Sequence, residues 1–464
     1  MYTMYLSSVL HQVTMNKNVY RSVLVLSYVI ASSSYAWPLL ASEQTRVSGG
    51  LIELASSLQT RPVLSDTQIK ALLPARGKFT FPAPYHTEAI RITNSSDCSG
   101  ATDCVNYVGY SYWRNINNHV DSDTMYIFLG LDRHRGGDGP TLFSYNKLTG
   151  GLKKTGPLFS ANSPYSWASG EGWYFSASHP TRLYMNEGAK MLRYDVISKQ
   201  METVFDATSH FGPDRTIWQM HSSNDDLVHS ATLRSGSDYE MLGCMVYYSD
   251  TKTFSYFPKT GDYDECQIDK SGGWLLIKEN VDGVNGEDNR IVELSTGTET
   301  ILLDENGAAG HSDLGYGTMV AADSWADLAN TQKIWRFAST PLQGTTLYSN
   351  LDWNVQAPAH VSYANASIDM PLSQQYACGS SANLQNSPHA NEIICFRMDT
   401  SAEVVVVAPV MTNLDAAGGG DNYGKSPKGN LDVTGKYFIW TSNTGGDRLD
   451  AFIVKVPAHL LQGN

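Results

Sequence analysis

Four side chains that can bind a transition metal recur along the chain at nearly constant intervals. They are His221, Cys266, His311 and His360, separated by 45, 45 and 49 residues. Imidazole and thiolate are donors that suit zinc, and carboxylates can complete the coordination of a metal ion. The sequence therefore predicts a divalent metal site, for zinc or calcium, with ligands from Cys266, His311, Asp313, Asp264 and His360.

A second group of reactive side chains lies near residue 130. His119 directly precedes an expected strand, and His134 lies between Arg133 and Arg135 in a Gly-rich turn. Two flanking cations lower the proton affinity of a histidine, and arginine can bind a carboxylate or a sulfate in a bidentate manner. The turn is therefore predicted to bind an anion beside a titratable base.

Tyr184 and Arg193 flank the next expected hairpin. Together with His119 and His134, they match the needs of β-elimination on a uronic acid. This reaction requires a cation on the carboxylate, a base for the adjacent proton and an acid for the departing glycosidic oxygen. The alternative for each residue is structural, because a tyrosine in a β-rich protein usually packs and an arginine in a turn is usually solvated.

Several other kinds of chemistry lack support in the sequence. Glycoside hydrolysis needs two facing carboxylates, and the spacing of the acidic residues singles out no pair. The Gly418-Gly-Gly run lacks the lysine of a phosphate-binding loop. A formal net charge of −13 disfavours nucleic acid and anionic lipid, which proteins bind through Lys and Arg. We therefore expect no nucleic acid partner.

A repeated strand-like phrase marks the elements that must position these residues. Seven copies, such as Leu142-Phe-Ser-Tyr-Asn and Met191-Leu-Arg-Tyr-Asp, begin at residues 142, 191, 245, 290, 333, 392 and 451. Internal similarity at about 40 to 50 residues is the spacing of a propeller blade. The sequence therefore predicts an all-β fold, a seven-bladed β-propeller of four-stranded antiparallel blades.

The repeat also predicts where the histidines lie. A polar, Gly-rich turn precedes most copies of the phrase, so each copy is expected to be the second strand of an inner hairpin. Side chains at matching positions of neighbouring blades then lie at the same depth of the central channel. There they either converge on a metal or form a belt that hydrogen-bonds neighbouring blades.

The N-terminal part of the chain has three expected roles. Residues 1–36 predict a signal peptide that ends at Ala36, and Met15 is an alternative start. Residues 37–78 are expected to form an arm or cap with a helix that begins at Ser65 or Asp66. Residues 79–464 are expected to form the propeller. A strand near Ala89 is expected to close the ring on the C-terminal blade, which removes an open sheet edge.

Six cysteines agree with an oxidising compartment, and thus with a secreted or periplasmic chain. Short separations suggest two pairs, Cys98 with Cys104 and Cys378 with Cys395. The other two cysteines remain unassigned. Connectivity cannot be read from sequence, and each cysteine could be a free thiol.

The chain alternates a short strand, a polar hairpin and a second strand that contains Tyr-Asp. This alternation resembles the TolB-like propellers, and particularly the propeller polysaccharide lyases such as ulvan lyases and oligogalacturonate lyases. Residues 125–150 and 173–206 carry the resemblance most clearly, and as a pattern it covers about residues 105–457. The motifs are general to this architecture, which hosts many functions. Cys266 departs from the pattern, because a metal-binding histidine would be expected there.

The resemblance implies a secreted, monomeric lyase that cleaves an anionic, uronic-acid-containing polysaccharide by β-elimination, with no membrane partner in the mature form. It implies catalytic roles for His119, His134, Tyr184 and Arg193. It also implies metal binding around Cys266, His311 and Asp313. From the sequence itself we expect substrate binding by Arg133, Arg135, Trp173 and His221. The alternative is a non-catalytic periplasmic or secreted propeller that binds a protein or a glycan.

Overall fold

The computed structural model describes residues 49–462, except for 100–102, 107, 111, 166–171, 285, 324–330 and 350–356. The chain divides into two compact units, Met1–Arg46 and Val47–Asn464, and every described residue belongs to the second unit. The expected signal peptide and the beginning of the expected arm lie outside the described residues. In the described part of the chain, no helix is long and apolar enough to span a membrane.

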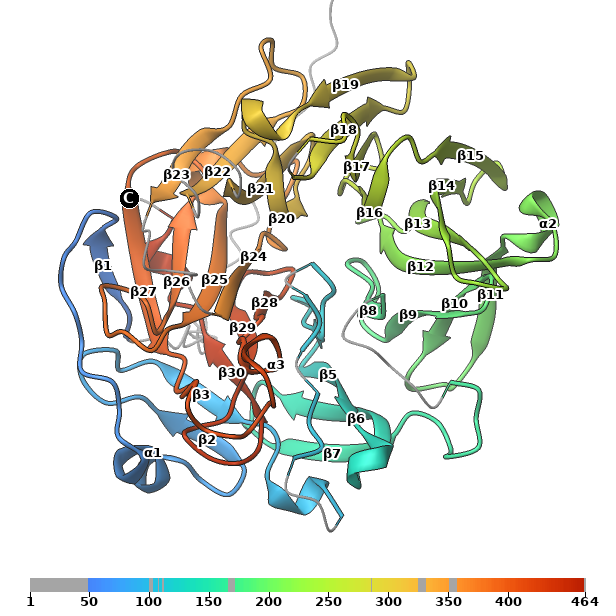
Figure 1. Ribbon diagram of the computed structural model, residues 1–464. Coiled ribbons are helices and arrows are strands. Elements are labelled where there is room, and N and C mark those ends of the chain that lie inside the picture. Colours follow the sequence, from blue (N-terminus) through green and yellow to red (C-terminus); the bar gives the residue numbers. More distant parts are fainter. Residues whose placement is uncertain are drawn as a thin grey trace, which may run out of the picture. The chain divides into compact units, whose positions relative to one another are not determined.

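Seven antiparallel sheets of the second unit form a ring, shown in Figure 1, so the predicted seven-bladed β-propeller is confirmed. Blade 1 contains β4 (Ile116–Asn117), β5 (Thr124–Leu131), β6 (Gly139–Asn146) and β7 (Leu152–Pro157). Blade 2 contains β8 (Tyr174–Phe175), β9 (Arg182–Glu187), β10 (Lys190–Asp195) and β11 (Met201–Asp206). Blade 3 contains β12 (Arg215–Ser222), β13 (Val228–Ser235), β14 (Met241–Tyr248) and β15 (Thr253–Pro258).

The remaining four blades continue around the ring. Blade 4 contains β16 (Asp262–Ile268), β17 (Trp274–Asn280), β18 (Asp288–Glu293) and β19 (Thr298–Leu302). Blade 5 contains β20 (Ala309–Leu314), β21 (Thr318–Asp323), β22 (Thr331–Arg336) and β23 (Thr345–Ser349). Blade 6 contains β24 (Ala357–Ser362), β25 (Tyr376–Ala382), β26 (Glu392–Arg397) and β27 (Glu403–Pro409). Blade 7 contains β28 (Asn430–Leu431), β29 (Tyr437–Ser442) and β30 (Asp450–Lys455).

The repeated phrase occupies the third strand of every blade, namely β6, β10, β14, β18, β22, β26 and β30. The sequence correctly predicted a hairpin at each copy, but this hairpin joins the second and third strands. The innermost strand precedes the hairpin and carries the predicted histidines, as β12, β20 and β24 show. The residues that line the channel therefore come from strands outside the repeated phrase.

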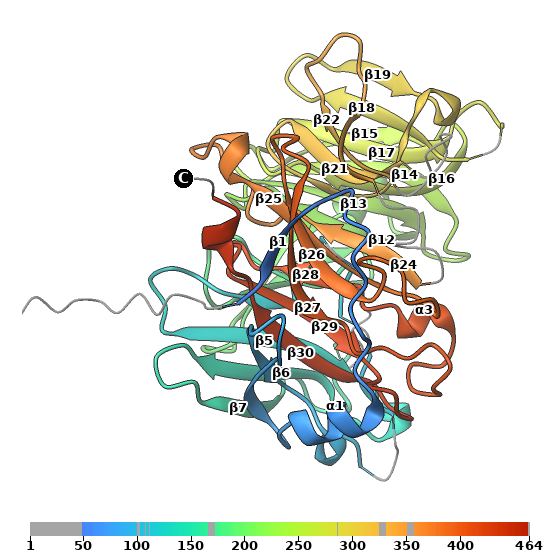
Figure 2. The same ribbon diagram turned by 90° about the vertical axis from the view of Figure 1, so that its left-hand side faces the viewer.

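Three N-terminal strands extend the last two blades. β3 (Glu88–Arg91) pairs with β30, with Ile90 opposite Ile453, and β2 (Gly77–Thr80) pairs with β3. β1 (Leu51–Leu54) pairs with β27 of blade 6, so blades 6 and 7 each have five strands. Figure 2 shows these N-terminal strands, in blue, beside the C-terminal strands, in red. The two ends of the unit are thus joined through backbone hydrogen bonds.

Helices are short in this unit. α1 (Asp66–Leu72) begins after Ser65, whose side chain accepts a hydrogen bond from the backbone N–H of Gln68 in a capping box, so the predicted helix is confirmed. The other helices are α2 (Thr208–Phe211) and α3 (Asn422–Lys425). Single 3-10 turns are η1 (Ser95–Asp97), η2 (Arg133–Arg135), η3 (Asp304–Asn306), η4 (Leu372–Gln374) and η5 (Ala458–Leu460).

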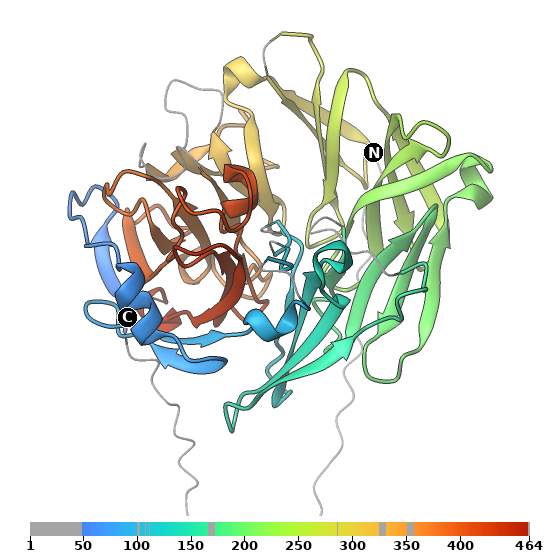
Figure 3. The same ribbon diagram turned by 60° about the horizontal axis from the view of Figure 1, so that its bottom comes forward.

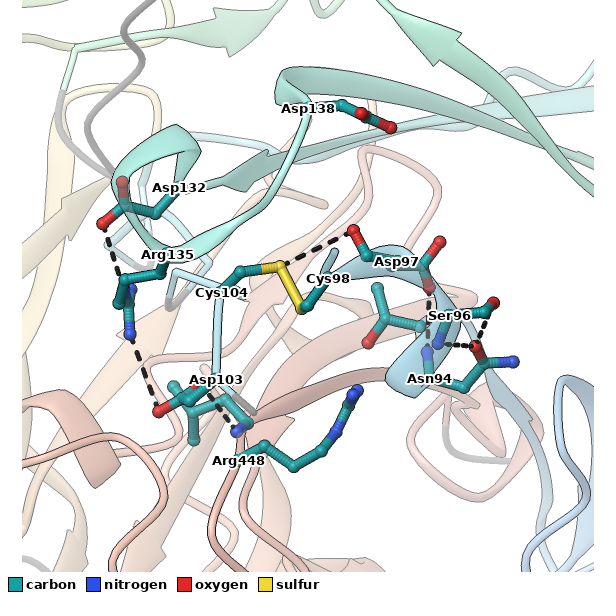
Figure 4. Close-up of a disulfide and its surroundings, with 12 residues drawn as sticks. Asn94, Ser96, Asp97, Cys98, Asp103, Cys104, Asp132, Arg135, Asp138 and Arg448 are labelled. Atoms are coloured by element: carbon teal, nitrogen blue, oxygen red, sulfur yellow. Dashed lines mark hydrogen bonds and ion pairs between the residues drawn. A yellow bond between two sulfur atoms is a disulfide. The ribbon is translucent and has the colours of Figure 1, made fainter. Parts of the chain in front are cut away.

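Three disulfides join the six cysteines. Cys98 pairs with Cys104 in the loop before blade 1 (Figure 4), and Cys378 pairs with Cys395 between β25 and β26. Cys244 of β14 pairs with Cys266 of β16, so this bridge connects blades 3 and 4. Neighbouring blades otherwise touch mainly through apolar side chains, such as Val246 and Ile277.

Replacing Cys244 and Cys266 together by alanine is expected to destabilise the propeller by about 3 kcal/mol, because the bridge closes a loop of roughly 20 residues in the unfolded chain. Urea unfolding of the variant and of the unmodified protein measures the difference. Mass spectrometry of a non-reduced digest checks the pairing itself. Equal unfolding midpoints with and without the bridge would contradict the expected contribution.

Candidate functional site

Four consecutive innermost strands carry a β-bulge in the wall of the channel. The pairing register shifts between Trp218 and His221 in β12, and comparable shifts occur in β16, β20 and β24. A bulge inserts an unpaired residue and re-aims the side chains that follow. The first residues paired after the four bulges are His221, Glu265, Ser312 and His360.

Cys266 is therefore one position away from the place that its spacing indicated. Successive side chains of a strand point to opposite faces, so a shift of one residue exchanges Cys266 for Glu265. The sulfur of Cys266 is bonded to that of Cys244 and cannot act as a thiolate ligand. The expectation of metal binding by Cys266 is thus wrong, and the position beside His221 belongs to a carboxylate.

Glu265 is almost fully buried and accepts hydrogen bonds from three side chains. The Tyr112 hydroxyl lies 3.1 Å from both carboxylate oxygens, and the Lys278 ammonium and the Gln267 amide nitrogen each lie 2.9 Å from Oε1. Burial favours the protonated acid, but the Lys278 charge outweighs it and holds the pKa of Glu265 below its ordinary value. Glu265 is consequently a charged, fully engaged group of the channel.

His311 and His360 are the two predicted metal ligands that lie together. Their ring centroids are 4.5 Å apart, and Tyr110 packs at 4.5 Å from the His360 ring and 5.8 Å from the His311 ring. Solvent in the channel reaches His311, yet the surrounding protein excludes enough water to lower its pKa to about 4. Tyr110 belongs to the segment before β4, which enters the centre of the ring in Figures 1 and 3.

The five predicted ligands do not form a metal site. Asp313 accepts a hydrogen bond from Lys270 at 3.0 Å and another from the backbone N–H of Tyr363 at 2.6 Å. Asp264 is the extra residue at the bulge of β16. Within the described ranges, no group of three or more His, Cys, Asp or Glu side chains is placed to hold one ion. The donors present therefore do not fit the expected metal.

A pocket in the channel wall lies between the segment before blade 1 and blades 3, 4 and 5. It combines two cations, one imidazole and one carboxylate with polar and apolar neighbours. Its lining residues are Tyr112, Arg114, His221, Ser222, Gln267, Ile268, Lys270, Asp313 and Leu314.

Arg114 forms no direct ion pair among the described residues, although the charges of Asp313 and Asp226 act on it from a greater distance. Its guanidinium donates to the backbone carbonyl of Phe175 at 3.1 and 3.3 Å, and in the described part of the chain no carboxylate lies within ion-pair distance. Only 7% of the residue is exposed, and burial lowers the pKa of Arg114. A buried cation without a paired anion is costly, so its presence beside a pocket indicates a place for an anionic ligand.

Lys270 provides a second cation at the pocket. It pairs with Asp313 at 3.0 Å, and its ammonium lies 5.5 Å from the centre of the Tyr363 ring. The turn between β16 and β17 places Lys270 directly after the inner strand that carries Glu265. Burial lowers the pKa of Lys270 and the Asp313 charge opposes this shift. With Arg114, Lys270 makes the pocket electropositive in a chain of net negative charge.

His221 faces the same pocket from β12. Its ring stacks on Trp113 with centroids 5.3 Å apart, and the Tyr112 ring lies at the same distance. Its Nε2 atom is buried and has no hydrogen-bond partner among the described residues. Burial lowers the pKa of His221 to about 4, so the imidazole is neutral at pH 7 and retains a lone pair for a proton.

Burial of two histidines predicts a pH-dependent stability. Burial lowers the pKa of His221 and of His229, which hydrogen-bonds Ser222 at 2.6 Å, to about 4. Between pH 6.5 and 4 the unfolded chain binds protons that the folded chain does not, so this stability is complete above pH 6.5 and is lost toward pH 4. The expected slope is roughly 1.4 kcal/mol per pH unit for each histidine.

Urea unfolding at pH 7 and pH 5 measures this effect, and His229→Gln provides the comparison. The variant keeps a polar side chain but cannot titrate, so its stability should fall less on acidification. An identical fall in both proteins would show that His229 is already protonated or solvent-accessible in the folded state.

His119 and His134 lie at opposite ends of β5. The eight residues of this strand span about 26 Å, so the two side chains cannot act on one substrate atom. His119 is half-buried, with Nε2 at 2.8 Å from Asn117 Oδ1, and burial together with the Arg114 charge lowers its pKa. His134 is exposed in η2. The structure therefore brings only His119 near the channel pocket.

Tyr184 and Arg193 lie opposite each other in β9 and β10. Tyr184 is buried between the rings of Tyr174 and His229, whereas Arg193 is partly exposed and pairs with Glu202 at 2.5 Å. These contacts account for both side chains without a substrate.

The predicted substrate contacts in blades 1 and 2 are also occupied by protein partners. Arg133 donates to the carbonyl of Phe159 at 3.0 Å, and Arg135 contacts Asp132 at 3.0 Å and Asn106 at 2.7 Å. Figure 4 shows Arg135 directed toward Asp132 and Asp103, close to the Cys98–Cys104 disulfide. Trp173 is 3% exposed, stacks on Phe128 and belongs to the core. Of the predicted substrate-binding residues, His221 alone lines the channel pocket.

Sequence reasoning missed Arg114, Lys270 and Glu265. Arg114 follows the aromatic run that ends at Trp113, and a lone cation at the end of such a run is a usable signal for a buried charge. Lys270 and Glu265 lie within four positions of Cys266, but the metal prediction directed attention to the sulfur.

Comparison with known proteins identifies the same architecture in two solved structures. No protein-family model matches the sequence, and a comparison with curated proteins gives no match. An oligogalacturonate lyase from Vibrio parahaemolyticus is 10% identical, with a TM-score of 0.56 over 88% of this chain and 99% of that protein. An oligogalacturonate lyase in complex with manganese is 12% identical, with a TM-score of 0.56 over 86% of this chain and 98% of that protein. The chain thus shares the seven-bladed propeller fold of these lyases.

Proposed function

We propose that this chain is a secreted polysaccharide lyase that cleaves a uronic-acid-containing polysaccharide by β-elimination. The observation that carries the proposal is the buried guanidinium of Arg114, which has no ion pair among the described residues, beside a pocket that also holds Lys270 and His221. The propeller fold shared with two oligogalacturonate lyases supports the choice of reaction. Three disulfides support an oxidising, extracellular or periplasmic compartment.

The reaction starts with the uronate carboxylate bound by Arg114 and Lys270. Two cations on this group stabilise the negative charge that develops when the adjacent C–H bond loses its proton. His221 is neutral at pH 7 and takes that proton at Nε2. The electron pair forms a double bond between C4 and C5, and the bond from C4 to the glycosidic oxygen breaks.

Tyr112 is the proposed acid for the departing oxygen. It lines the same pocket and packs against His221, with ring centroids 5.3 Å apart. Its hydroxyl hydrogen-bonds Glu265, which holds the phenol in place. Transfer of the Tyr112 proton to the leaving oxygen gives a free hydroxyl on one fragment and an unsaturated uronate on the other. No step is routed through the expected divalent metal, because only His311 and His360 of its five predicted ligands lie together among the described residues.

Incubation of the mature protein with pectate, alginate, ulvan and glycosaminoglycans tests the proposal. A lyase produces a conjugated uronate that absorbs in the ultraviolet, whereas a hydrolase produces none. Tyr112→Phe is expected to lower kcat by about 10² to 10⁴ with a small change in KM, because the hydroxyl acts on the leaving group. Binding of these polymers without product formation would favour the alternative, a non-catalytic propeller that binds glycans.

A further inference from the structure

An arginine lies against two aromatic rings in blade 3, away from the channel pocket. The guanidinium carbon of Arg234 is 5.3 Å from the centre of the Trp218 ring and 4.9 Å from the centre of the Tyr239 ring. Trp218 belongs to β12, Arg234 to β13 and Tyr239 to the turn between β13 and β14. We call these three residues the Arg234 stack. Contacts of this kind fix the plane of the guanidinium.

Arg234 has no anionic partner in the part of the chain that the structure describes. The acidic side chains of the neighbouring turns have other partners. Glu240 pairs with Lys259 at 2.8 Å, Asp214 accepts a hydrogen bond from Ser237 at 3.1 Å, and Asp238 accepts one from the backbone N–H of Glu240 at 3.1 Å. The Nε atom of Arg234 is buried without a hydrogen-bond partner, and burial lowers the pKa of the side chain. The stack therefore holds a partly desolvated cation with unused donors.

The geometry of the stack determines what can bind it. Two aromatic rings lie against the guanidinium, so the donors that remain for a ligand lie at its edge, where they match the two oxygens of a carboxylate or a sulfate. Tyr239 is 60% exposed, so its ring offers an apolar surface next to those donors. Its φ of 62° lies in the left-handed region, which residues other than glycine seldom adopt, and this conformation holds the ring beside Arg234.

The stack is a separate site from the channel pocket. Arg234 pairs with Thr216 near the start of β12, whereas His221 is five positions further along this strand. At about 3.3 Å per residue the two places are roughly 16 Å apart. A ligand group held at the stack is therefore too distant to take part in proton transfer at His221.

We propose that the Arg234 stack is a second, non-catalytic binding site for an anionic sugar residue. The edge of the guanidinium binds a carboxylate or a sulfate ester, and the sugar ring lies against Tyr239. The choice of a sugar rests on the proposed function, whereas the anion site rests only on the contacts of Arg234. Such a site would hold a distant part of the polysaccharide while another part occupies the channel.

Calorimetry with trigalacturonate tests the site in the double variant Arg114→Met/Lys270→Met, which lacks the channel cations. Adding Arg234→Met is expected to weaken binding at least tenfold, and Arg234→Lys is expected to restore part of it. Tyr239→Ala, which changes an exposed side chain, should also weaken binding and leaves the core intact. Arg397→Met is the matched control, because Arg397 already pairs with Glu403 at 2.9 Å, and it should leave the affinity unchanged.

Two further probes identify the anion. Fully methyl-esterified trigalacturonate has the same rings without charge and should not bind, whereas a sulfated trisaccharide that binds better than trigalacturonate would assign the site to sulfate esters. Equal affinity with and without Arg234→Met and Tyr239→Ala, or equal binding of the esterified probe, would overturn the proposal. Binding that depends on Arg234 in a protein that forms no unsaturated product would retain this site and reject the lyase function.

Discussion

Replacement of Arg114 by methionine is expected to lower kcat/KM on oligouronates by about 10³ or more while the protein stays folded. The guanidinium neutralises the carboxylate whose charge grows in the transition state, and removal of one such preorganised donor typically costs 10² to 10³ in rate. Weaker substrate binding adds to this loss. The measurement is the initial rate of unsaturated product formation over a range of substrate concentrations.

The stability of the same variant separates this role from a structural one. Arg114 is buried and has no ion pair in the described part of the chain, so an apolar residue of similar length removes the cost of burying an unpaired charge. The substitution also removes the two donors of the buried Phe175 carbonyl, and this cost is expected to offset the relieved charge, so Arg114→Met should resist urea about as well as the unmodified protein. Activity lost together with several kcal/mol of stability would indicate that Arg114 supports the fold instead.

Arg193→Met provides the comparison with the assignment made from sequence. Arg193 pairs with Glu202 on the outer part of blade 2, and it lies outside the channel pocket. The variant should keep its activity if Arg114 neutralises the substrate carboxylate. Inactivity of Arg193→Met with full activity of Arg114→Met would reverse the two assignments.

Replacement of His221 by asparagine is the second large effect that we expect. A general base typically contributes 10² to 10⁴ in rate, so kcat should fall by about that factor while KM changes little. Burial lowers the pKa of His221 to about 4, so the imidazole is ready to accept a proton at every pH above that value. The rate of the unmodified enzyme should therefore hold on acidification to about pH 5 and decrease as the pH falls through 4.

The pH profile of His221→Asn distinguishes a base from a packing residue. Its residual activity should lack the decrease near pH 4, because the titrating group is absent. His119→Asn is the matched control, since His119 is a half-buried histidine whose Nε2 already contacts Asn117 at 2.8 Å. A variant of His221 that keeps its rate but unfolds more easily would show that the ring only packs against Trp113.

The fold could be predicted from the sequence because the repeated phrase is a backbone signal. Each copy contains apolar residues within its first two positions, such as Met191 and Met245, which pack in the core, and these positions recur wherever a blade recurs. The phrase lies in the third strand, however, and the innermost strands differ from blade to blade. Spacing alone consequently located the blades but not the residues that face the channel.

The bulges explain why the metal prediction was incomplete. A repeat measured in residues cannot show where the bulge falls in each inner strand, although its position in β16 decides whether Glu265 or Cys266 points into the channel. His311 and His360 were correctly placed beside each other, since their rings are 4.5 Å apart. The partner of Cys266 could not be read from the chain, because its disulfide to Cys244 depends on two blades packing together.

The channel pocket was harder to predict than the ring. Arg114 enters from an irregular segment before β4, and Lys270 comes from a turn, so neither belongs to a periodic pattern. Their proximity depends on how blade 1 faces blades 3, 4 and 5. Long-range contacts of this kind leave no spacing signal in a single sequence, whereas a buried arginine with no carboxylate partner in the described ranges is evident once the structure is known.

The most direct test of the proposed activity is the ultraviolet absorbance of purified mature protein incubated with oligogalacturonate and with the other uronate polymers. Beta-elimination predicts a steady rise from the unsaturated uronate on at least one of them, reduced about 10³-fold in Arg114→Met. A flat absorbance on every uronate substrate, from protein shown to be folded and oxidised, would contradict the assignment of this propeller as a lyase.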